Sequence, residues 1–186
     1  MQEQKDPRLW VRVAVNLAEH DPQLLFLMIG EGYLLDSVKQ QVSATPSLTN
    51  RLLFLPFLER PKLAGVLRAG LYKDGRGVLR LHQEPDACPG HTMLLMTSEN
   101  EGLPYVILES MALGLQVVTP HVGAVEEITA VAPDRIRIVH ERSVEALAQA
   151  VLSSFLRVPA AGHFPIDYIF ETFQKKFRAL LNQFTF

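Results

Sequence analysis

Residues 92–120, TMLLMTSENEGLPYVILESMALGLQVVTP, contain the pattern that decides the fold. The apolar run over 92–97 predicts a strand that is buried on both faces, as in a parallel sheet. A polar turn then leads into a predicted helix over 104–113, and Gly114 suits a C-terminal cap of that helix. The apolar run over 116–119 predicts the next strand. This succession of strand, helix and strand predicts parallel strands joined by right-handed crossovers.

The same alternation extends to both sides of this stretch. Asp6 and Pro7 are typical of a helix N-cap followed by proline at the first helical position, and Ser143 is typical of a second N-cap. We therefore expect one three-layer, Rossmann-like α/β domain over 1–186, with a parallel sheet of about five or six strands. The further predicted helices cover 7–19, 34–42, 59–69, 122–130, 143–156 and 166–182, and the further predicted strands cover 24–29, 51–57 and 135–140.

The segment 71–91 does not fit this alternation, because it is rich in glycine, proline and charged residues. Connections between elements in such folds usually need only about 2–6 residues. We therefore interpret the segment as a loop insertion. A tolerated surface insertion is favoured over a functional lid.

The composition is that of a globular domain, with 48% hydrophobic residues, 20% charged residues and a net charge of −2. No basic stripe predicts a nucleic-acid partner, no apolar run is long enough to span a bilayer, and the N-terminus lacks the apolar core of a signal peptide. The single cysteine, Cys88, excludes an internal disulfide framework, and its spacing to His82 and His91 fits no zinc site. We expect a cytoplasmic protein.

The candidate site lies where segments follow the predicted strands, because ligands of open parallel sheets bind at the carboxyl ends of the strands. These segments are 30–32, 57–58 and 98–104. In the last of them, the first N–H groups of the helix have no partner within it and can bind a phosphate without a basic side chain. Gly102 allows the backbone to approach a ligand, and the carboxylate of Glu109 can accept hydrogen bonds from two ribose hydroxyls.

Residues 101–114, EGLPYVILESMALG, resemble the E-x7-E signature of glycosyltransferase family 4 and its GT-B relatives. Three flanking segments, 26–32, 51–55 and 116–127, are similar to the same family. The resemblance implies the C-terminal, nucleotide-sugar-binding half of a GT-B enzyme. That enzyme would be a retaining, hexosyltransferase-like glycosyltransferase that needs no metal ion and no other cofactor. The sequence contains no Asp-x-Asp metal-binding pattern, which agrees with this implication.

The resemblance also implies a role for each matching residue. Glu101 would contact the hydroxyls of the transferred sugar as the catalytic residue, and Glu109 would bind the ribose. Lys5 matches a lysine that pairs with the diphosphate and stabilises the departing nucleotide, where negative charge accumulates in the transition state. The other donor-binding positions would contact the base, the diphosphate or the sugar, and they are Gly30, Phe57, Leu58, Gly102, Leu103 and Pro104.

Some features depart from the family's pattern. Pro56 stands where a glycine is usual, and Ala124 replaces a second glycine near the diphosphate. By the same comparison, we expect this chain to lack the family's acceptor-binding N-terminal domain, together with a strand and an arginine just before the Lys5 position. We therefore expect four partners: a nucleotide-sugar donor, an acceptor that is a sugar, a lipid-linked sugar or a protein, the missing domain, and a membrane surface contacted peripherally through that domain.

Alternatives remain for the residues and for the function. Glu109 can be read as a solvated helix residue, and Glu101 as a loop carboxylate favoured by the helix dipole. A glycosidase pair of carboxylates is disfavoured by the phosphate-binding helix start, and an epimerase-like protein by the lack of a glycine-rich fingerprint after the first strand. The main alternative is a catalytically inactive, truncated remnant that folds and binds nucleotide only.

Overall fold

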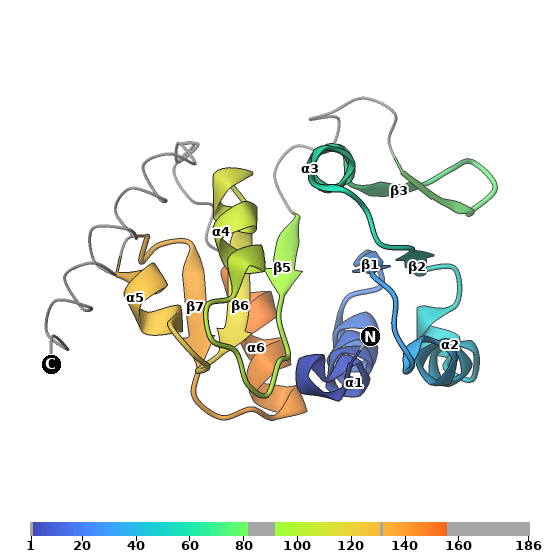
Figure 1. Ribbon diagram of the computed structural model, residues 1–186. Helices are drawn as coiled ribbons and strands as arrows, with labels where there is room; N and C mark the ends of the chain where they lie inside the picture. The colour runs from blue at the N-terminus through green and yellow to red at the C-terminus, as the bar shows by residue number, and fades with distance from the viewer. Residues whose placement is uncertain (1, 82–91, 131, 156–186) are drawn as a thin grey trace, which may run out of the picture.

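The computed structural model describes residues 2–81, 92–130 and 132–155 (Figure 1). Helices and strands alternate along most of this chain, as the apolar pattern predicts. The helices are α1 (Pro7–His20), α2 (Leu35–Ser43), α3 (Arg60–Ala69), α4 (Tyr105–Ala112), α5 (Val125–Thr129) and α6 (Val144–Phe155). The strands are β1 (Phe26–Ile29), β2 (Leu52–Leu55), β3 (Leu71–Lys73), β4 (Leu79–Leu81), β5 (Met93–Leu95), β6 (Gln116–Pro120) and β7 (Ile136–Val139). Two short 3-10 helices, η1 (Glu3–Lys5) and η2 (Pro46–Leu48), complete the described elements.

The parallel strands form two sheets. β1 pairs with β2 in parallel, and β6 lies between β5 and β7, parallel to both. The prediction of a parallel α/β fold is confirmed. The five parallel strands that were expected in one sheet are divided between a two-stranded and a three-stranded sheet.

Helices cover both faces of the three-stranded sheet, and β6 shows how the sequence achieves this. Successive side chains of a strand point to opposite faces. Val117 packs in one core cluster with Ile107 of α4 and Val125 of α5, whereas Val118 packs in the other with Leu147 of α6. These two clusters make the layers that Figure 1 shows, with α4 and α5 on one side of β6 and α6 on the other.

Local signals at the helix ends act as the sequence predicts. The Asp6 carboxylate accepts a hydrogen bond from the Leu9 backbone N–H at 2.9 Å, and Ser143 Oγ accepts one from Ala146 at 3.2 Å. Gly114 follows α4 with a φ of 77°, in the left-handed region that favours glycine. The boundaries of these helices therefore depend on side chains and backbone angles close to them in sequence.

The first half of the expected insertion is a β-hairpin. β3 and β4 pair antiparallel, and the Asp74 carboxylate accepts hydrogen bonds from the backbone N–H groups of Arg76 and Val78 in the turn. Arg80 Nε also donates to this carboxylate at 2.6 Å. The bond from Arg80, followed by those from Val78 and Arg76, lowers the pKa of Asp74. The expectation of a loop is thus wrong for residues 71–81. Residues 82–91 and the helix predicted over 166–182 lie outside the described residues.

Candidate functional site

The segment that follows β5 is bound to the first residues of the chain. The Glu99 backbone N–H donates to the Gln4 carbonyl oxygen at 2.8 Å, and Gln4 Nε2 donates to the Asn100 carbonyl oxygen at 2.6 Å. These bonds place η1 beside the loop that carries the start of the E-x7-E signature. Two segments that lie far apart in sequence are therefore joined at the carboxyl end of β5.

Lys5 and Glu101, which the sequence analysis names for different parts of a donor, form an ion pair. Lys5 Nζ lies 2.6 Å from Glu101 Oε1. The Lys5 side chain is 53% exposed, but the Glu101 side chain is only 9% exposed. The lysine thus supplies the positive charge beside a nearly covered carboxylate.

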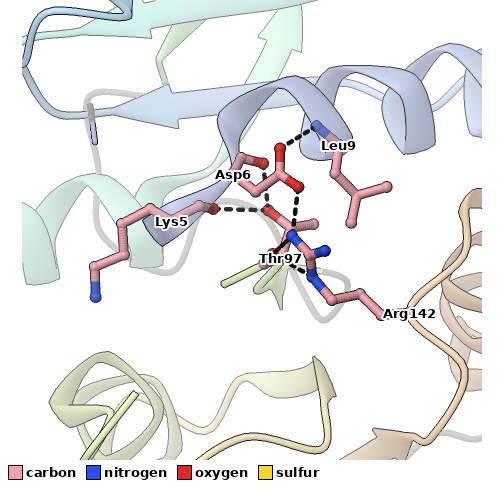
Figure 2. Close-up of polar contacts among 5 residues, drawn as sticks. All are labelled: Lys5, Asp6, Leu9, Thr97 and Arg142. Atoms are coloured by element: carbon pink, nitrogen blue, oxygen red, sulfur yellow. Dashed lines mark hydrogen bonds and ion pairs between the residues drawn. The ribbon is translucent and has the colours of Figure 1, made fainter. Parts of the chain in front are cut away.

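A second group of polar contacts holds the backbone next to Lys5 (Figure 2). Thr97 Oγ1 lies 3.1 Å from the Lys5 carbonyl oxygen and 3.0 Å from that of Asp6. Arg142, from the loop between β7 and α6, donates to the Asp6 carboxylate and to the Thr97 carbonyl oxygen. Asp6, Thr97 and Arg142 therefore link the N-terminus of α1, the end of β5 and the start of α6.

The loop of Glu101 and Gly102 is also fixed from the turn between β6 and α5. The Ala124 backbone N–H donates to the Gly102 carbonyl oxygen at 3.0 Å. A Cβ on Gly123 would lie 2.2 Å from the Glu101 carbonyl oxygen, so only glycine fits there, and its φ of 54° favours glycine as well. No role was predicted for Gly123, although a glycine shortly after a strand is a signal that the sequence contains.

The start of α4 lies one residue later than expected. Pro104 is buried and occupies the N-cap position, and the Ile107 backbone N–H donates to its carbonyl oxygen at 3.0 Å. Tyr105 is the first helical residue and is 53% exposed. Leu103 packs against the core beneath α4 and α5, whereas Gly102 is exposed. The first turn of α4 is thus anchored on its core side and open to solvent at Tyr105.

Glu109 forms an ion pair with Arg60, a residue that sequence reasoning missed. Arg60 Nε lies 3.0 Å from Glu109 Oε1, and the two side chains are 82% and 32% exposed. Arg60 begins α3 two residues after Leu58, and the Phe57 side chain is 71% exposed. The ion pair connects the segment expected to contact the base with the residue expected to contact the ribose. A lone arginine at the start of a helix has no sequence pattern that reveals this pairing.

The turn after β1 reaches the same group of segments. Gly30 and Gly32 have φ angles of 129° and 140°, which side-chain-bearing residues rarely adopt. The Gly30 backbone N–H donates to the Leu55 carbonyl oxygen at 3.1 Å. The Tyr33 hydroxyl accepts a hydrogen bond from the Glu3 backbone N–H at 3.2 Å, which links this turn to η1.

Within residues 2–81, 92–130 and 132–155, no three His, Cys, Asp or Glu side chains are grouped in a way that could hold a metal ion. His82, Cys88 and His91 lie outside these ranges. No helix in the described part of the chain is both long enough and apolar enough to cross a bilayer.

Comparison with known proteins adds a sequence similarity and a structural one. Residues 81–155, which include the E-x7-E stretch, match the family model described as "Glycosyl transferases group 1". No curated protein matches the chain.

Three solved structures with this fold contain UDP or UDP-glucose. The pneumococcal O-GlcNAc transferase GtfA, in complex with UDP and GlcNAc, has a TM-score of 0.61 and 15% identity over 97% of this chain and 34% of its own. A point mutant of S. aureus TarM, in complex with Fondaparinux, alpha-GlcNAc-glycerol and UDP, has a TM-score of 0.58 and 16% identity over 94% of this chain and 33% of its own. Anabaena HepE, in complex with UDP-glucose, has a TM-score of 0.51 and 18% identity over 96% and 46%.

The similarity is confined to one part of each of these larger proteins. The chain spans between 33% and 46% of their length. It therefore has the Rossmann-like α/β fold of the C-terminal domain of GT-B glycosyltransferases, and residues 81–155 share the sequence pattern of glycosyl transferases group 1.

Proposed function

We propose that this chain is the donor-binding half of a retaining, hexosyltransferase-like glycosyltransferase that binds a nucleotide-diphosphate sugar without a metal ion. One observation carries the proposal. Each carboxylate of the E-x7-E signature lies against a basic side chain from a remote segment, Glu101 against Lys5 and Glu109 against Arg60. A nucleotide sugar carries hydroxyl groups, which carboxylates bind as hydrogen-bond acceptors, and phosphates, which basic side chains bind through charge-assisted hydrogen bonds.

The comparisons support the choice of ligand. GtfA was solved with UDP and HepE with UDP-glucose, so a uridine nucleotide is the first ligand to test. The match over residues 81–155 supports transfer of a glycosyl group rather than another use of a nucleotide.

In the proposed reaction, the bond between the anomeric carbon and the diphosphate breaks, and a bond to an acceptor oxygen forms on the same face of the sugar. The acceptor would be a sugar, a lipid-linked sugar or a protein, whose hydroxyl proton leaves with the departing diphosphate. Lys5 and the first backbone N–H groups of α4 stabilise the negative charge on that diphosphate. Glu101 holds the hydroxyls of the sugar, and Glu109 those of the ribose. The backbone at Gly30, Gly102, Leu103 and Pro104, together with Phe57 and Leu58, completes the donor site.

A thermal-shift panel of UDP, GDP, ADP and their sugars at millimolar concentration tests the proposal. A ligand at about 100 times its Kd stabilises the folded state by about 2.7 kcal/mol, which shifts the Tm of a chain of this length by several degrees. We expect one nucleotide series to raise the Tm, and Glu109→Ala to remove the rise. Loss of the exposed pair with Arg60 changes the ligand-free stability by only about 0–1 kcal/mol.

Glu19→Ala, which changes an exposed carboxylate in the last turn of α1, is the matched control and keeps the shift. No Tm change with any of the three series contradicts the proposal. Nucleotide binding is expected under both the proposal and the alternative, a folded remnant that binds nucleotide only. A second α/β domain encoded upstream of this chain supports the proposal, and its absence from the encoding nucleic acid supports the remnant.

A further inference from the structure

We propose that Arg142 is a positioning residue for Lys5, and that it acts through Asp6 and Thr97 rather than by touching the ligand. The inference rests on the proposed function, in which Lys5 binds the diphosphate of the donor. Arg142 lies outside every segment that the sequence analysis connects with donor binding, so its role follows from the contacts alone.

Arg142 donates hydrogen bonds to two residues, Asp6 and Thr97. Arg142 Nη2 donates to Asp6 Oδ2 and, at 3.2 Å, to the Thr97 carbonyl oxygen, and Nε donates to the same carbonyl at 3.3 Å. The side chains of Arg142 and Asp6 are only 29% and 28% exposed. A partly buried, charge-assisted pair is stronger and more restrictive than an ion pair on the open surface.

Thr97 connects Arg142 with the backbone of Lys5. Thr97 is 3% exposed, and its hydroxyl faces the carbonyl oxygens of both Lys5 and Asp6. Thr97 thus accepts hydrogen bonds from Arg142 at its backbone carbonyl and contacts the Lys5 backbone with its side-chain hydroxyl. Figure 2 shows the Lys5 side chain leaving this cluster on the side away from Arg142.

Asp6 has an unusual backbone conformation. Its φ of 42° and ψ of 63° are left-handed, which is unfavourable for a residue with a Cβ. Its N–H donates to the Glu3 carbonyl oxygen at 2.7 Å and closes η1, while Oδ1 caps α1 through the Leu9 N–H. Arg142 holds the other carboxylate oxygen, so both oxygens stabilise the bend that directs Lys5 away from the axis of α1.

Such positioning matters because a lysine has a long, flexible stem. A charge-assisted hydrogen bond from a lysine to a phosphate contributes more to affinity when the lysine ammonium is already held near its bound position. Fixing the Lys5 backbone on the carboxyl side of its Cα places Nζ beside the loop of Glu101, where the diphosphate is proposed to lie.

Titration of the whole chain with UDP and with uridine, which lacks the phosphates, tests the inference. A charge-assisted bond to a phosphate is worth at least about tenfold in affinity. We therefore expect Arg142→Ala to weaken UDP binding about tenfold and to leave uridine binding within about twofold. Because Arg142 acts through Lys5, we expect the variant that carries both Arg142→Ala and Lys5→Ala to bind UDP with the same affinity as the variant that carries Lys5→Ala alone. Arg12→Ala, an exposed arginine of α1, serves as the control.

Hydrogen exchange without ligand supplies a second readout. The Glu99 amide, which donates to Gln4, is expected to exchange faster in Arg142→Ala, while the Val117 amide, which donates to the Arg135 carbonyl in the sheet, does not change.

The outcomes separate the two proposals. Three results would each overturn the role of Arg142: equal weakening of UDP and uridine binding, additive effects of Arg142→Ala and Lys5→Ala on UDP binding, or an unchanged exchange rate of the Glu99 amide. In each case, nucleotide binding by the wild type still upholds the proposed function. If GDP or ADP is the nucleotide that binds, it and its nucleoside replace UDP and uridine in the titration. A wild type that binds none of UDP, GDP and ADP contradicts the proposed function and, with it, a role of Arg142 in donor binding.

Discussion

At the scale of single residues, Gly123 sets how closely two loops of the candidate site can approach. The turn between β6 and α5 lies against the carbonyl groups of Glu101 and Gly102, at distances that leave no room for a Cβ. Because the atoms in contact are backbone, no side-chain rotation can relieve the clash. The position of the loop of Glu101 and Gly102 therefore depends on a residue that contributes no functional group.

Gly123→Ala is expected to lower the free energy of unfolding by about 1–3 kcal/mol, since overpacking and a strained φ both act against the folded state. Urea denaturation followed by circular dichroism measures the change. The matched control is Gly65→Ala in α3, where a Cβ meets nothing within 4 Å. That substitution is expected to stabilise the chain by up to about 1 kcal/mol, because alanine is the better helix former. A Gly123→Ala variant as stable as the wild type would show that the two loops move apart without cost.

Single residues also show where sequence reasoning reaches its limit. Asp6, Gly114 and Ser143 could be predicted as helix termini, because each acts on backbone atoms within a few positions of itself. Arg60 and Arg142 could not be predicted, because their partners come from remote segments and a lone arginine has no characteristic spacing. For the same reason, the resemblance that named Lys5 and Glu101 separately did not reveal that they pair.

At the scale of elements, a buried arginine connects the first helix with the first sheet. Arg51, 8% exposed, precedes β2 and donates to the carbonyl oxygen of Ala18 in the last turn of α1. It also donates to the carbonyl oxygens of Asp21 and Leu24, which lie between α1 and β1. Burial lowers the pKa of Arg51 from its ordinary value, and the nearby charge of Asp21 partly opposes that change. The guanidinium thus satisfies the carbonyls that the end of α1 leaves open.

Arg51→Met is expected to reduce the free energy of unfolding by about 2–4 kcal/mol, because it leaves several partly buried carbonyl groups without donors. Chemical denaturation measures this loss, and Arg12→Met on the exposed face of α1 serves as the comparison. Equal stabilities of the two variants would contradict the structural role assigned to Arg51.

The element that the sequence did not reveal is the β3–β4 hairpin. Its strands have three residues each, too few for an alternating pattern to emerge. The turn between them contains the glycine and charged residues that are typical of loops. The bonds that Asp74 makes to Arg76, Val78 and Arg80 convert this composition into an ordered turn.

At the scale of the whole molecule, one core cluster joins the two parallel sheets. It contains Phe26 and Met28 of β1, Val118 of β6, Leu9 of α1 and Leu147 of α6. The alternation of apolar runs was sufficient to predict these strands and helices. It could not predict that the strands divide between two sheets, because strand neighbours are chosen by contacts between distant segments.

Leu147→Ala is expected to destabilise the chain by about 2–5 kcal/mol, since the Leu147 side chain is fully buried. Native-state hydrogen exchange is expected to show faster exchange of the slowest amides in β1 and in β6 alike. Glu145→Ala, an exposed neighbour on α6, leaves both sets of amides unchanged. Acceleration in only one of the two sheets would mean that they unfold independently.

The pair between Lys5 and Glu101 has one further consequence under the proposed function. In the ligand-free protein each group already has an oppositely charged partner, so a diphosphate that binds Lys5 must compete with the carboxylate. Binding is then an exchange: as the lysine turns to the phosphate, Glu101 is released to accept hydrogen bonds from the sugar. The two ends of the donor would therefore be recognised together, and a free diphosphate or a free sugar would each bind more weakly than the sum of their contacts implies.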